Sequence, residues 1–178
     1  MSIAVITLTR HEVAAQLELL ERVYLDMYSL SAEAGPPFAD GLLERSQREG
    51  FKLCAAYDDQ RGELVGLAYG FTGLPGQMWT DAMAEALEPT VAEEWLDRHF
   101  EFAEFGVMQA RQGAGIGARL HDALFADLPQ RRAVLTVRTR QQPARGFYER
   151  RGWITLHQDF YSTTGRGPYC IMGLDLAR

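Results

Sequence analysis

The sequence predicts a single mixed α/β domain over residues 1–178, and three observations support this fold class. Apolar runs with strand character alternate with segments whose apolar residues recur at helical spacing. The hydrophobic fraction of 47% is sufficient to build a core. No repeat, low-complexity stretch or linker interrupts the pattern. Strands and helices in this alternation pack in layers around one core.

The first 50 residues predict one strand and two helices. Thr9 and Glu12 have the spacing of a capping box, in which two side chains satisfy backbone amides at a helix start. Residues 35–37, Gly-Pro-Pro, break the chain, and Asp40 is placed to cap the second helix. The predicted elements are a strand at Ile3–Leu8, a helix carrying Val13, Leu17, Leu20 and Tyr24 at helical spacing, and a short helix ending near Gly50.

Residues 51–108 predict three strands and an interposed helical segment. A polar turn at residues 58–62 joins two apolar runs, which is typical of a hairpin. Residues 77–97 place Trp79, Met83 and Leu87 on one helical face, with a break at Pro89. The predicted strands are Phe51–Tyr57, Glu63–Phe71 and Phe100–Met108, the last interrupted by Glu101 and Glu104.

The remaining chain predicts two helices and three strands. Pro143 begins a short helix at its favoured first position, and Gly152 ends it. The other helix, Gly115–Leu128, carries an apolar residue at every fourth position, namely Ile116, Leu120, Leu124 and Leu128. The predicted strands are Ala133–Thr139, Ile154–Tyr161 and Tyr169–Leu176.

Charge is unevenly distributed along the chain, whose net charge is −6. Residues 111–178 hold 11 Arg and Lys against 5 Asp and Glu, whereas residues 1–110 hold 7 against 19. A basic half suits a polyanionic ligand and an acidic half a cationic one, although solvated surface charge is the simpler alternative for the acidic half. The acidic total, without a dense basic run, argues against nucleic-acid binding.

Composition also indicates where the protein resides in the cell and whether it binds a metal. No apolar run is long enough to span a membrane, and the N-terminus lacks the features of a signal peptide. Cys54 and Cys170 are too few for a disulfide framework or a metal cluster, and both lie in strand-like runs that predict buried free thiols. We expect a cytoplasmic protein without membrane contact or bound metal.

A glycine-rich turn at residues 112–117, Gln-Gly-Ala-Gly-Ile-Gly, is the most informative motif. Glycines allow tight turning and close approach to the backbone, and the helix that follows directs free N–H groups and its positive dipole end at the turn. Such a site suits a phosphate or pyrophosphate. A simple packing turn is the alternative without a ligand.

Two nucleotide-binding motifs are alternative interpretations of this turn. Residues 113–118 fit the dinucleotide fingerprint G-x-G-x-x-A, which would indicate an oxidoreductase. That fingerprint belongs in the first strand-to-helix turn, with an acidic residue about 20 positions later. Here about a hundred residues precede it, and the next strand ends at Arg138-Thr139-Arg140 without the acid. A Walker P-loop is excluded because no Gly-Lys-Ser/Thr follows.

Two blocks together resemble the GNAT superfamily of acyl-CoA-dependent N-acyltransferases. Phe105–Leu120 is similar to the family's pyrophosphate motif, Q/R-x-x-G-x-G/A, and Ala144–Trp153 is similar to its A-x-x-L-Y-x-x-x-G-F block. One predicted strand separates them, and the order of elements also matches. The resemblance implies a mixed, mostly antiparallel central sheet of six to seven strands, splayed between the fourth and fifth strands and flanked by helices.

The resemblance implies that acetyl-CoA is the acyl donor. Amides within Gln112–Ala118 would hold its pyrophosphate, and the fourth strand around Phe105–Met108 would pair with the pantetheine arm. An amide at Phe105 or Val107 would polarise the thioester carbonyl. Arg111, Arg119 and Arg145 are candidates for phosphate contacts, and Gln141 replaces a frequent family Asn. The predicted coenzyme A residues are Phe105, Val107, Met108, Arg111, Gln112, Gly113, Ala114, Gly115, Ile116, Gly117, Ala118, Gln141 and Arg145.

The implied reaction is direct attack of an amine on the thioester. Tyr148 matches the family tyrosine that protonates the departing thiolate; aromatic packing is its alternative role. Glu101 holds the position of the family's fourth-strand glutamate base, and Glu104 competes with it; a salt-bridged strand end is the alternative for either. A fifth-strand glutamate used by some members is replaced by Thr136, so that variant is unsupported.

The acceptor site of this family comes from the first two helices and the loop between the last strands. The acidic, aromatic and basic residues there are Asp26, Tyr28, Glu33, Tyr161 and Arg166, and residues 74–98, with Trp79 and Trp95, are placed to wall the site. These residues favour a small cationic amine as acceptor. The predicted function is N-acetyltransferase; the alternative is a non-catalytic acyl-CoA-binding sensor or interaction module. A homodimer is compatible with the sequence.

Overall fold

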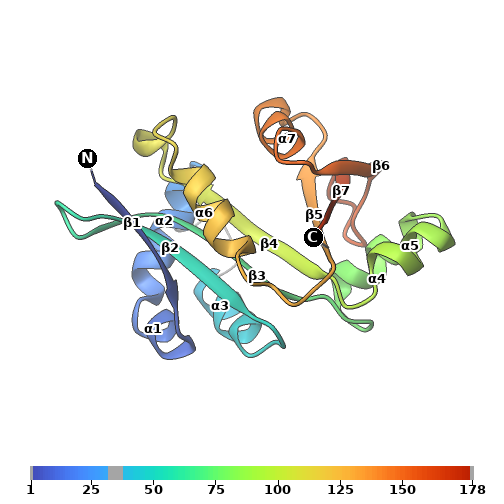
Figure 1. Cartoon of the computed structure of the whole chain (residues 1–178), viewed down its shortest axis with the longest axis horizontal. Helices are drawn as coiled ribbons and strands as arrows, with labels where there is room; N and C mark the ends of the chain where they lie inside the picture. Colours follow the sequence, from blue (N-terminus) through green and yellow to red (C-terminus); the bar gives the residue numbers. More distant parts are fainter. Residues whose placement is uncertain (1, 32–37, 177–178) are drawn as a thin grey trace. The chain divides into compact units, whose positions relative to one another are not determined.

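Seven strands form one mixed sheet in the order β1-β2-β3-β4-β5-β7-β6 (Figure 1). The computed structural model describes residues 2–31 and 38–176. The strands are β1 Ile3–Leu8, β2 Lys52–Asp58, β3 Glu63–Thr72, β4 Phe100–Val107, β5 Arg132–Arg138, β6 Ile154–Phe160 and β7 Tyr169–Asp175. The helices are α1 Arg10–Ala15, α2 Leu17–Met27, α3 Phe38–Ser46, α4 Met78–Ala86, α5 Pro89–Trp95, α6 Ile116–Phe125 and α7 Gln142–Glu149, with a 3₁₀ turn, η1, at Gln109–Arg111.

The predicted fold class, a mixed and mostly antiparallel α/β sheet flanked by helices, is confirmed. The pairs β1–β2, β2–β3, β5–β7 and β6–β7 are antiparallel. Strands β4 and β5 run parallel and pair at Phe100–Ala133 and Glu101–Val134. The capping box of Thr9 and Glu12 is also present, because each side chain binds the other residue's backbone amide.

Two helices differ from their predicted bounds. The single predicted helix after Thr9 is divided at Gln16, whose backbone leaves the helical region (φ −117°, ψ 17°) and whose side chain accepts a hydrogen bond from the Tyr57 hydroxyl. Helix α6 ends at Phe125 instead of Leu128. The Lys52 ammonium donates to the carbonyl groups of Ala123 and Ala126, which satisfies acceptors at that helix end.

The start of the third helix also differs from prediction. Asp40 lies inside the first turn of α3, which begins at Phe38, so Asp40 does not cap the helix. The predicted chain break at residues 35–37 lies outside the described residues. The same helix ends at Ser46 and not near Gly50. The other predicted strands and helices agree with the structure to within one or two residues at their ends.

The described residues pack as two compact units, each made of two stretches of chain. The first unit takes the chain up to Phe71 and adds Ala103–Asp127. The second unit consists of Thr72–Phe102 and the chain from Leu128 onward. Strand β4 therefore gives its first three residues to the second unit and its last five to the first.

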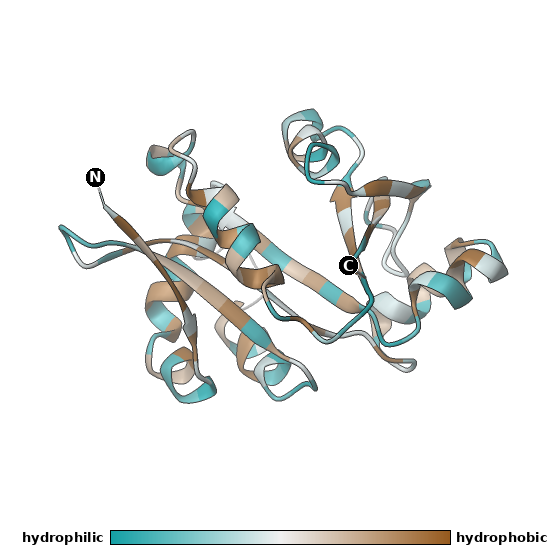
Figure 2. Cartoon of the chain, viewed as in Figure 1, coloured by the Kyte–Doolittle hydropathy of each residue, from teal (hydrophilic) through white to brown (hydrophobic). Residues whose placement is uncertain are grey.

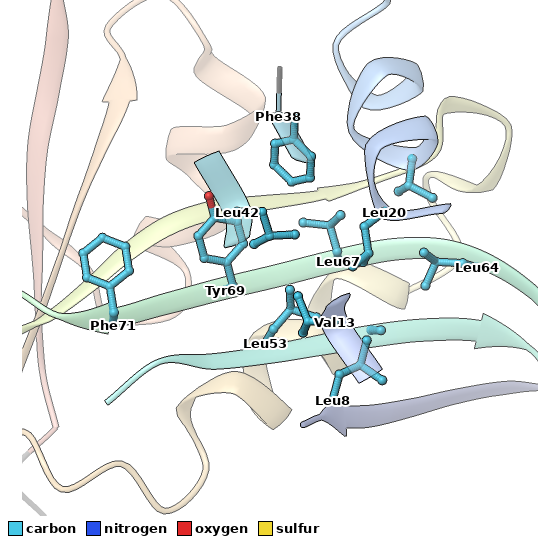
Figure 3. Close-up of a cluster of buried hydrophobic side chains, with 12 residues drawn as sticks. Leu8, Val13, Leu20, Phe38, Leu42, Leu53, Leu64, Leu67, Tyr69 and Phe71 are labelled. Carbon is cyan, nitrogen blue, oxygen red and sulfur yellow. The ribbon is translucent and has the colours of Figure 1, made fainter. Parts of the chain in front are cut away.

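The first unit has helices on both faces of its strands, with α6 on the face opposite α1–α3 (Figure 1). Alternate residues of β3 serve the two faces, as a strand requires. Leu67 and Tyr69 pack into the core on the α1–α3 face, together with Leu20 and Leu42 (Figure 3). Gly66 faces the other way, where an added Cβ would lie 3.0 Å from Leu120 of α6.

The second unit has its own core between the two inserted helices and the last strands. Its buried cluster is formed by Ala82, Met83, Leu87, Trp95, Leu96, Val134, Phe160 and Ile171. The Trp95 ring lies directly on Gly173 of β7, where an added Cβ would be 2.5 Å from the ring. The helical segment between β3 and β4 is therefore an integral part of this unit.

Exposure and hydropathy follow the fold. Figure 2 shows that the turn between β2 and β3 is hydrophilic, as predicted for a hairpin turn. Cys54 and Cys170 are buried free thiols, which confirms the sequence prediction. Within residues 2–31 and 38–176, no helix is both long and apolar enough to cross a membrane.

Candidate active site

The glycine turn lies in the first unit and connects η1 to α6. Gly113 and Gly115 have φ values of 79° and 77°, a left-handed conformation that L side chains rarely adopt. No atom lies within 4 Å of a Cβ built on either residue, so backbone conformation, not crowding, requires glycine here. Gly115 is the N-cap of α6 and provides no side chain to cap its first amides.

The turn is anchored to the strands that precede it. The Met108 amide donates to the Val65 carbonyl at 2.9 Å, and the Gln112 side chain donates to the Val107 carbonyl at 3.1 Å. Ile116, the first residue of α6, is only 2% exposed. The turn is thus anchored before its glycines by hydrogen bonds and after them by the burial of Ile116.

Arg111 connects η1 to the two residues that flank the β2–β3 turn. Its guanidinium lies 3.1 Å from the Asp58 carboxylate and 2.9 Å from the Glu63 carboxylate. Asp58 is almost fully buried, so the Arg111 charge compensates a carboxylate that has little contact with water. The contact of Arg111 with phosphate stays a prediction.

The end of α2 contacts η1 and the end of β4 through successive residues. The Asp26 carboxylate accepts the Gln109 amide at 2.8 Å, and the Asp26 carbonyl accepts the Gln109 side chain at 2.9 Å. The Gln109 side chain also donates to the Ser29 hydroxyl. Met27 covers Gly106, where an added Cβ would lie 2.3 Å from the Met27 methyl group.

Glu104 of β4 has a carboxyl group whose pKa is strongly shifted. Burial raises its pKa to about 7, and the hydrogen bond from the Tyr28 hydroxyl opposes that rise. Burial also raises the pKa of the neighbouring Tyr69 phenol, so that group stays neutral. Tyr24, which meets the Tyr28 ring edge-on, stacks on Phe38 at 4.1 Å between ring centres.

Glu101 lies in the second unit, and its partner comes from α4. The Thr80 hydroxyl donates to Glu101 Oε2 at 3.1 Å, and the two residues are 3% and 7% exposed. Thr80 is not among the site residues predicted from the sequence. The available signal was a hydroxyl residue on the apolar face of a helix, in register with Met83 and Leu87.

Tyr148 lies near the end of α7 and is 8% exposed. Its ring meets Phe102 of β4 edge-on at 6.2 Å and Trp153 at 5.8 Å, measured between ring centres. Those contacts fix the ring, as expected for an aromatic packing residue and equally for a positioned proton donor. Gln141 is the N-cap at the start of α7. Within the helix, the Arg145 guanidinium lies 3.7 Å from the Glu149 carboxylate.

The other predicted acceptor residues are distributed over different elements. Tyr161 is 58% exposed after β6, and the Arg166 amide donates to the Ser162 hydroxyl within the β6–β7 loop. Trp79 of α4 packs on Phe160 at 5.8 Å between ring centres. Glu33 lies outside the described residues. Among the residues that are described, no three His, Cys, Asp or Glu side chains come together as metal ligands would.

Comparison with known proteins places this geometry in context. The model of the Acetyltransferase (GNAT) family matches residues 17–153. A GCN5-like protein acetyltransferase of Mycobacterium tuberculosis is 26% identical over 132 residues, which are 70% of this chain and 64% of that protein. The chain therefore spans just under two thirds of that relative's length.

Solved acetyltransferases share the fold at low sequence identity. A chimeric spermidine N-acetyltransferase from Vibrio cholerae and hSSAT superimposes with a TM-score of 0.64 at 16% identity, covering 99% of this chain and 96% of that one. The PaiA N-acetyltransferase of Thermoplasma acidophilum, in complex with coenzyme A, gives a TM-score of 0.62 at 15% identity, covering 98% and 99%.

Proposed function

Because the chain belongs to the GNAT acetyltransferase family, we propose that it transfers an acetyl group from acetyl-CoA to a primary amine. The observation that carries the proposal is the glycine turn after β4, with two left-handed glycines at the N-terminus of α6. The family match covers both this turn and the Tyr148 block. The solved relative that contains coenzyme A supports the choice of donor.

Backbone amides are the proposed ligands of the donor's pyrophosphate. Residues Gln112–Ala118 supply them, and the dipole of α6 adds positive potential at the same end. The end of β4, around Phe105–Met108, is proposed to pair with the pantetheine arm. The excess of Arg and Lys from residue 111 onward supports binding of a polyanion, and Arg145 is the proposed contact of the 3′-phosphate.

The proposed chemistry is a single displacement through a tetrahedral intermediate. The neutral amine nitrogen attacks the thioester carbonyl carbon, and the new oxyanion is stabilised by a β4 amide at Phe105 or Val107. The nitrogen loses a proton to a carboxylate base, the C–S bond breaks, and Tyr148 donates its phenolic proton to the thiolate. The products are an N-acetyl amine and coenzyme A, and solvent returns the proton to Tyr148.

Glu101 is the proposed base, because it holds the β4 position of the family's glutamate and has a buried hydrogen-bond donor beside it. Glu104 is the second candidate. Its pKa of about 7 would let it accept a proton near neutrality. Replacement of each carboxyl by its amide distinguishes them, since only loss of the base removes the acidic limb of the pH–rate profile.

A small cationic amine is the proposed acceptor. The excess of Asp and Glu in residues 1–110 favours a cation, and one solved relative is named for spermidine acetylation. A protein amine is the competing acceptor, since the relative from Mycobacterium tuberculosis is named as a protein acetyltransferase. A panel that contains spermidine, agmatine, anionic amino acids and lysine peptides separates these classes.

Release of coenzyme A thiol from acetyl-CoA with this panel tests the proposal. We expect turnover with cationic amines, and a loss of about 100-fold or more in kcat for Tyr148→Phe, which keeps the ring but removes the proton donor. Tyr57→Phe is the matched control, because that hydroxyl binds Gln16. Binding of acetyl-CoA without turnover of any amine would favour the non-catalytic module, and preferential binding of NADPH would overturn acetyl-CoA as the proposed donor.

A further inference from the structure

Thr80 is a buried polar residue in the first turn of α4, a helix of the segment between β3 and β4. Its side chain donates to Glu101 Oε2 at 3.1 Å, and only 3% of the residue is exposed. A buried carboxylate is costly unless hydrogen bonds replace its lost hydration. Thr80 supplies such a bond from another element, 21 residues earlier in the chain.

The Thr80 hydroxyl is a rigid donor. Threonine is branched at Cβ, so few χ1 rotamers are open to it in a helix. Such hydroxyls often bond the carbonyl one turn back in their own helix, whereas this one bonds a side chain on β4. The last torsion of a glutamate side chain is otherwise broadly distributed. The bond to Thr80 therefore selects one orientation of the Glu101 carboxylate.

Contacts on either side fix the first turn of α4. The Gln77 side chain donates to the Thr72 carbonyl at 3.2 Å, and the Asp81 carboxylate accepts the Gly76 amide at 2.9 Å. The Trp79 ring packs on Tyr169, perpendicular to it, at 5.8 Å between ring centres. The residues before and after Thr80 are thus anchored, which fixes where its hydroxyl can lie.

We propose that Thr80 is a positioning residue for the acetyl transfer, which holds the Glu101 carboxylate in the orientation and charge state needed to accept the amine proton. This inference rests on the proposed function. Helix α4, inserted between β3 and β4, would then act on the reaction through Glu101. Besides the hydroxyl, the first turn of α4 contributes the positive end of its dipole, which also favours a carboxylate.

Three substitutions separate this role from simple packing. Thr80→Val removes the hydroxyl but keeps the branched shape, and Thr80→Ser keeps the hydroxyl. We expect Thr80→Val to lower kcat about tenfold, as for loss of one hydrogen bond to a charged group, with the KM for acetyl-CoA unchanged. Thr80→Ser should restore kcat to within about threefold. Thr90→Val, at an exposed position of α5, is the matched control.

The pH–rate profile and a double-mutant cycle give the decisive results. Thr80→Val removes a hydrogen-bond donor that favours the ionised Glu101 carboxylate. The acidic limb of its pH–rate profile should therefore move to higher pH by about half a unit to one unit. If Thr80 acts through Glu101, Thr80→Val should cost nothing further in a Glu101→Gln background. Additive losses, or an unshifted profile with full activity, would overturn the proposal.

A carboxyl titration followed by ¹³C NMR keeps this inference separate from the proposed function. The Glu101 signal is assigned by its absence in Glu101→Gln, and its titration is compared between the parent protein and Thr80→Val. An upward shift of its pKa in the variant shows that Thr80 controls Glu101 even if no amine is acetylated. An identical titration in both proteins would refute the positioning role, whatever the activity.

Discussion

The carboxylate of Asp26, at the end of α2, accepts the backbone amide of Gln109, the first residue of η1, at 2.8 Å. The bond joins residues 83 positions apart, next to the turn proposed to hold the donor's pyrophosphate. It fixes the start of the path from β4 into that turn. The end of α2 and the glycine turn are therefore parts of one connected arrangement within the first unit.

We predict that this bond contributes to binding of coenzyme A. Asp26→Ala should bind coenzyme A about fivefold more weakly than Asp26→Asn, because asparagine keeps an oxygen acceptor for the Gln109 amide. Both variants lose the same negative charge, so the comparison removes its repulsion of the phosphates. Isothermal titration calorimetry measures both affinities, with Asp40→Ala as an exposed control. Equal affinities of the two variants would show that the bond is unimportant.

A second prediction concerns Glu104, whose pKa of about 7 lies above its ordinary value of 4.5. The folded state then binds the proton more tightly than the unfolded state, so its contribution to stability is full below pH 4.5 and is lost as pH rises through 7. Relative to Glu104→Gln, the parent protein should lose about 1–2 kcal/mol between pH 5 and pH 8, allowing for partial solvent screening.

Urea unfolding of the two proteins at pH 5, 6.5 and 8 measures this difference. Tyr28→Phe provides a further check, since it removes a hydrogen bond that lowers the Glu104 pKa and should extend the loss to higher pH. The exposed Glu18→Gln variant should show the same pH dependence as the parent protein. A constant difference between the parent and Glu104→Gln at all three pH values would contradict the assignment.

A third prediction concerns His99, which is fully buried in the second unit. Burial lowers its pKa to about 4 from 6.5. The unfolded state binds the proton more tightly between these values, so stability should fall as the pH drops below 6.5, the opposite direction to Glu104. Relative to His99→Gln, the parent protein should lose about 2 kcal/mol between pH 7 and pH 5, as urea unfolding would show.

Gly73 tests the same packing independently. The His99 ring lies directly over Gly73, where an added Cβ would be 2.1 Å from ring carbon Cε1. The ring also binds the Leu96 carbonyl through Nδ1 at 3.3 Å, so it has little freedom to move. Gly73→Ala should therefore destabilise the protein by about 1–3 kcal/mol at pH 7, as overpacked sites do. Unchanged stability would show that the ring relocates easily.

Local sequence signals predict most elements of this fold. The Thr9–Glu12 capping box, the polar hairpin turn and the left-handed glycines depend on residues within a few positions of one another. The features that were missed depend on distant residues. The break at Gln16 involves Tyr57, and the early end of α6 involves Lys52, 71 residues before Ala123. No spacing rule in the sequence contains such contacts.

The same distinction applies to the candidate site. The turn, Tyr148 and the two β4 glutamates stand out in the sequence because they match a motif or place charge inside an apolar strand. Thr80, the partner of Glu101, does not stand out in the sequence, and Tyr28, the partner of Glu104, stands out only as a candidate acceptor residue, because neither hydroxyl can be assigned to a glutamate until folding brings the two together. Residue types that bear chemistry are visible in the sequence, but the groups that orient them depend on tertiary contacts.

The last prediction separates two roles for Arg111, which bridges Asp58 and Glu63 across the hairpin. Arg111→Gln leaves the buried Asp58 carboxylate without its cation and should cost about 3 kcal/mol of stability. Asp58→Asn in the same chain removes the unpaired charge and should recover most of that loss. If Arg111 serves mainly as this anchor, the double variant should bind coenzyme A within about threefold of the parent protein. Weak binding by a double variant of normal stability would instead indicate that Arg111 contacts the phosphates.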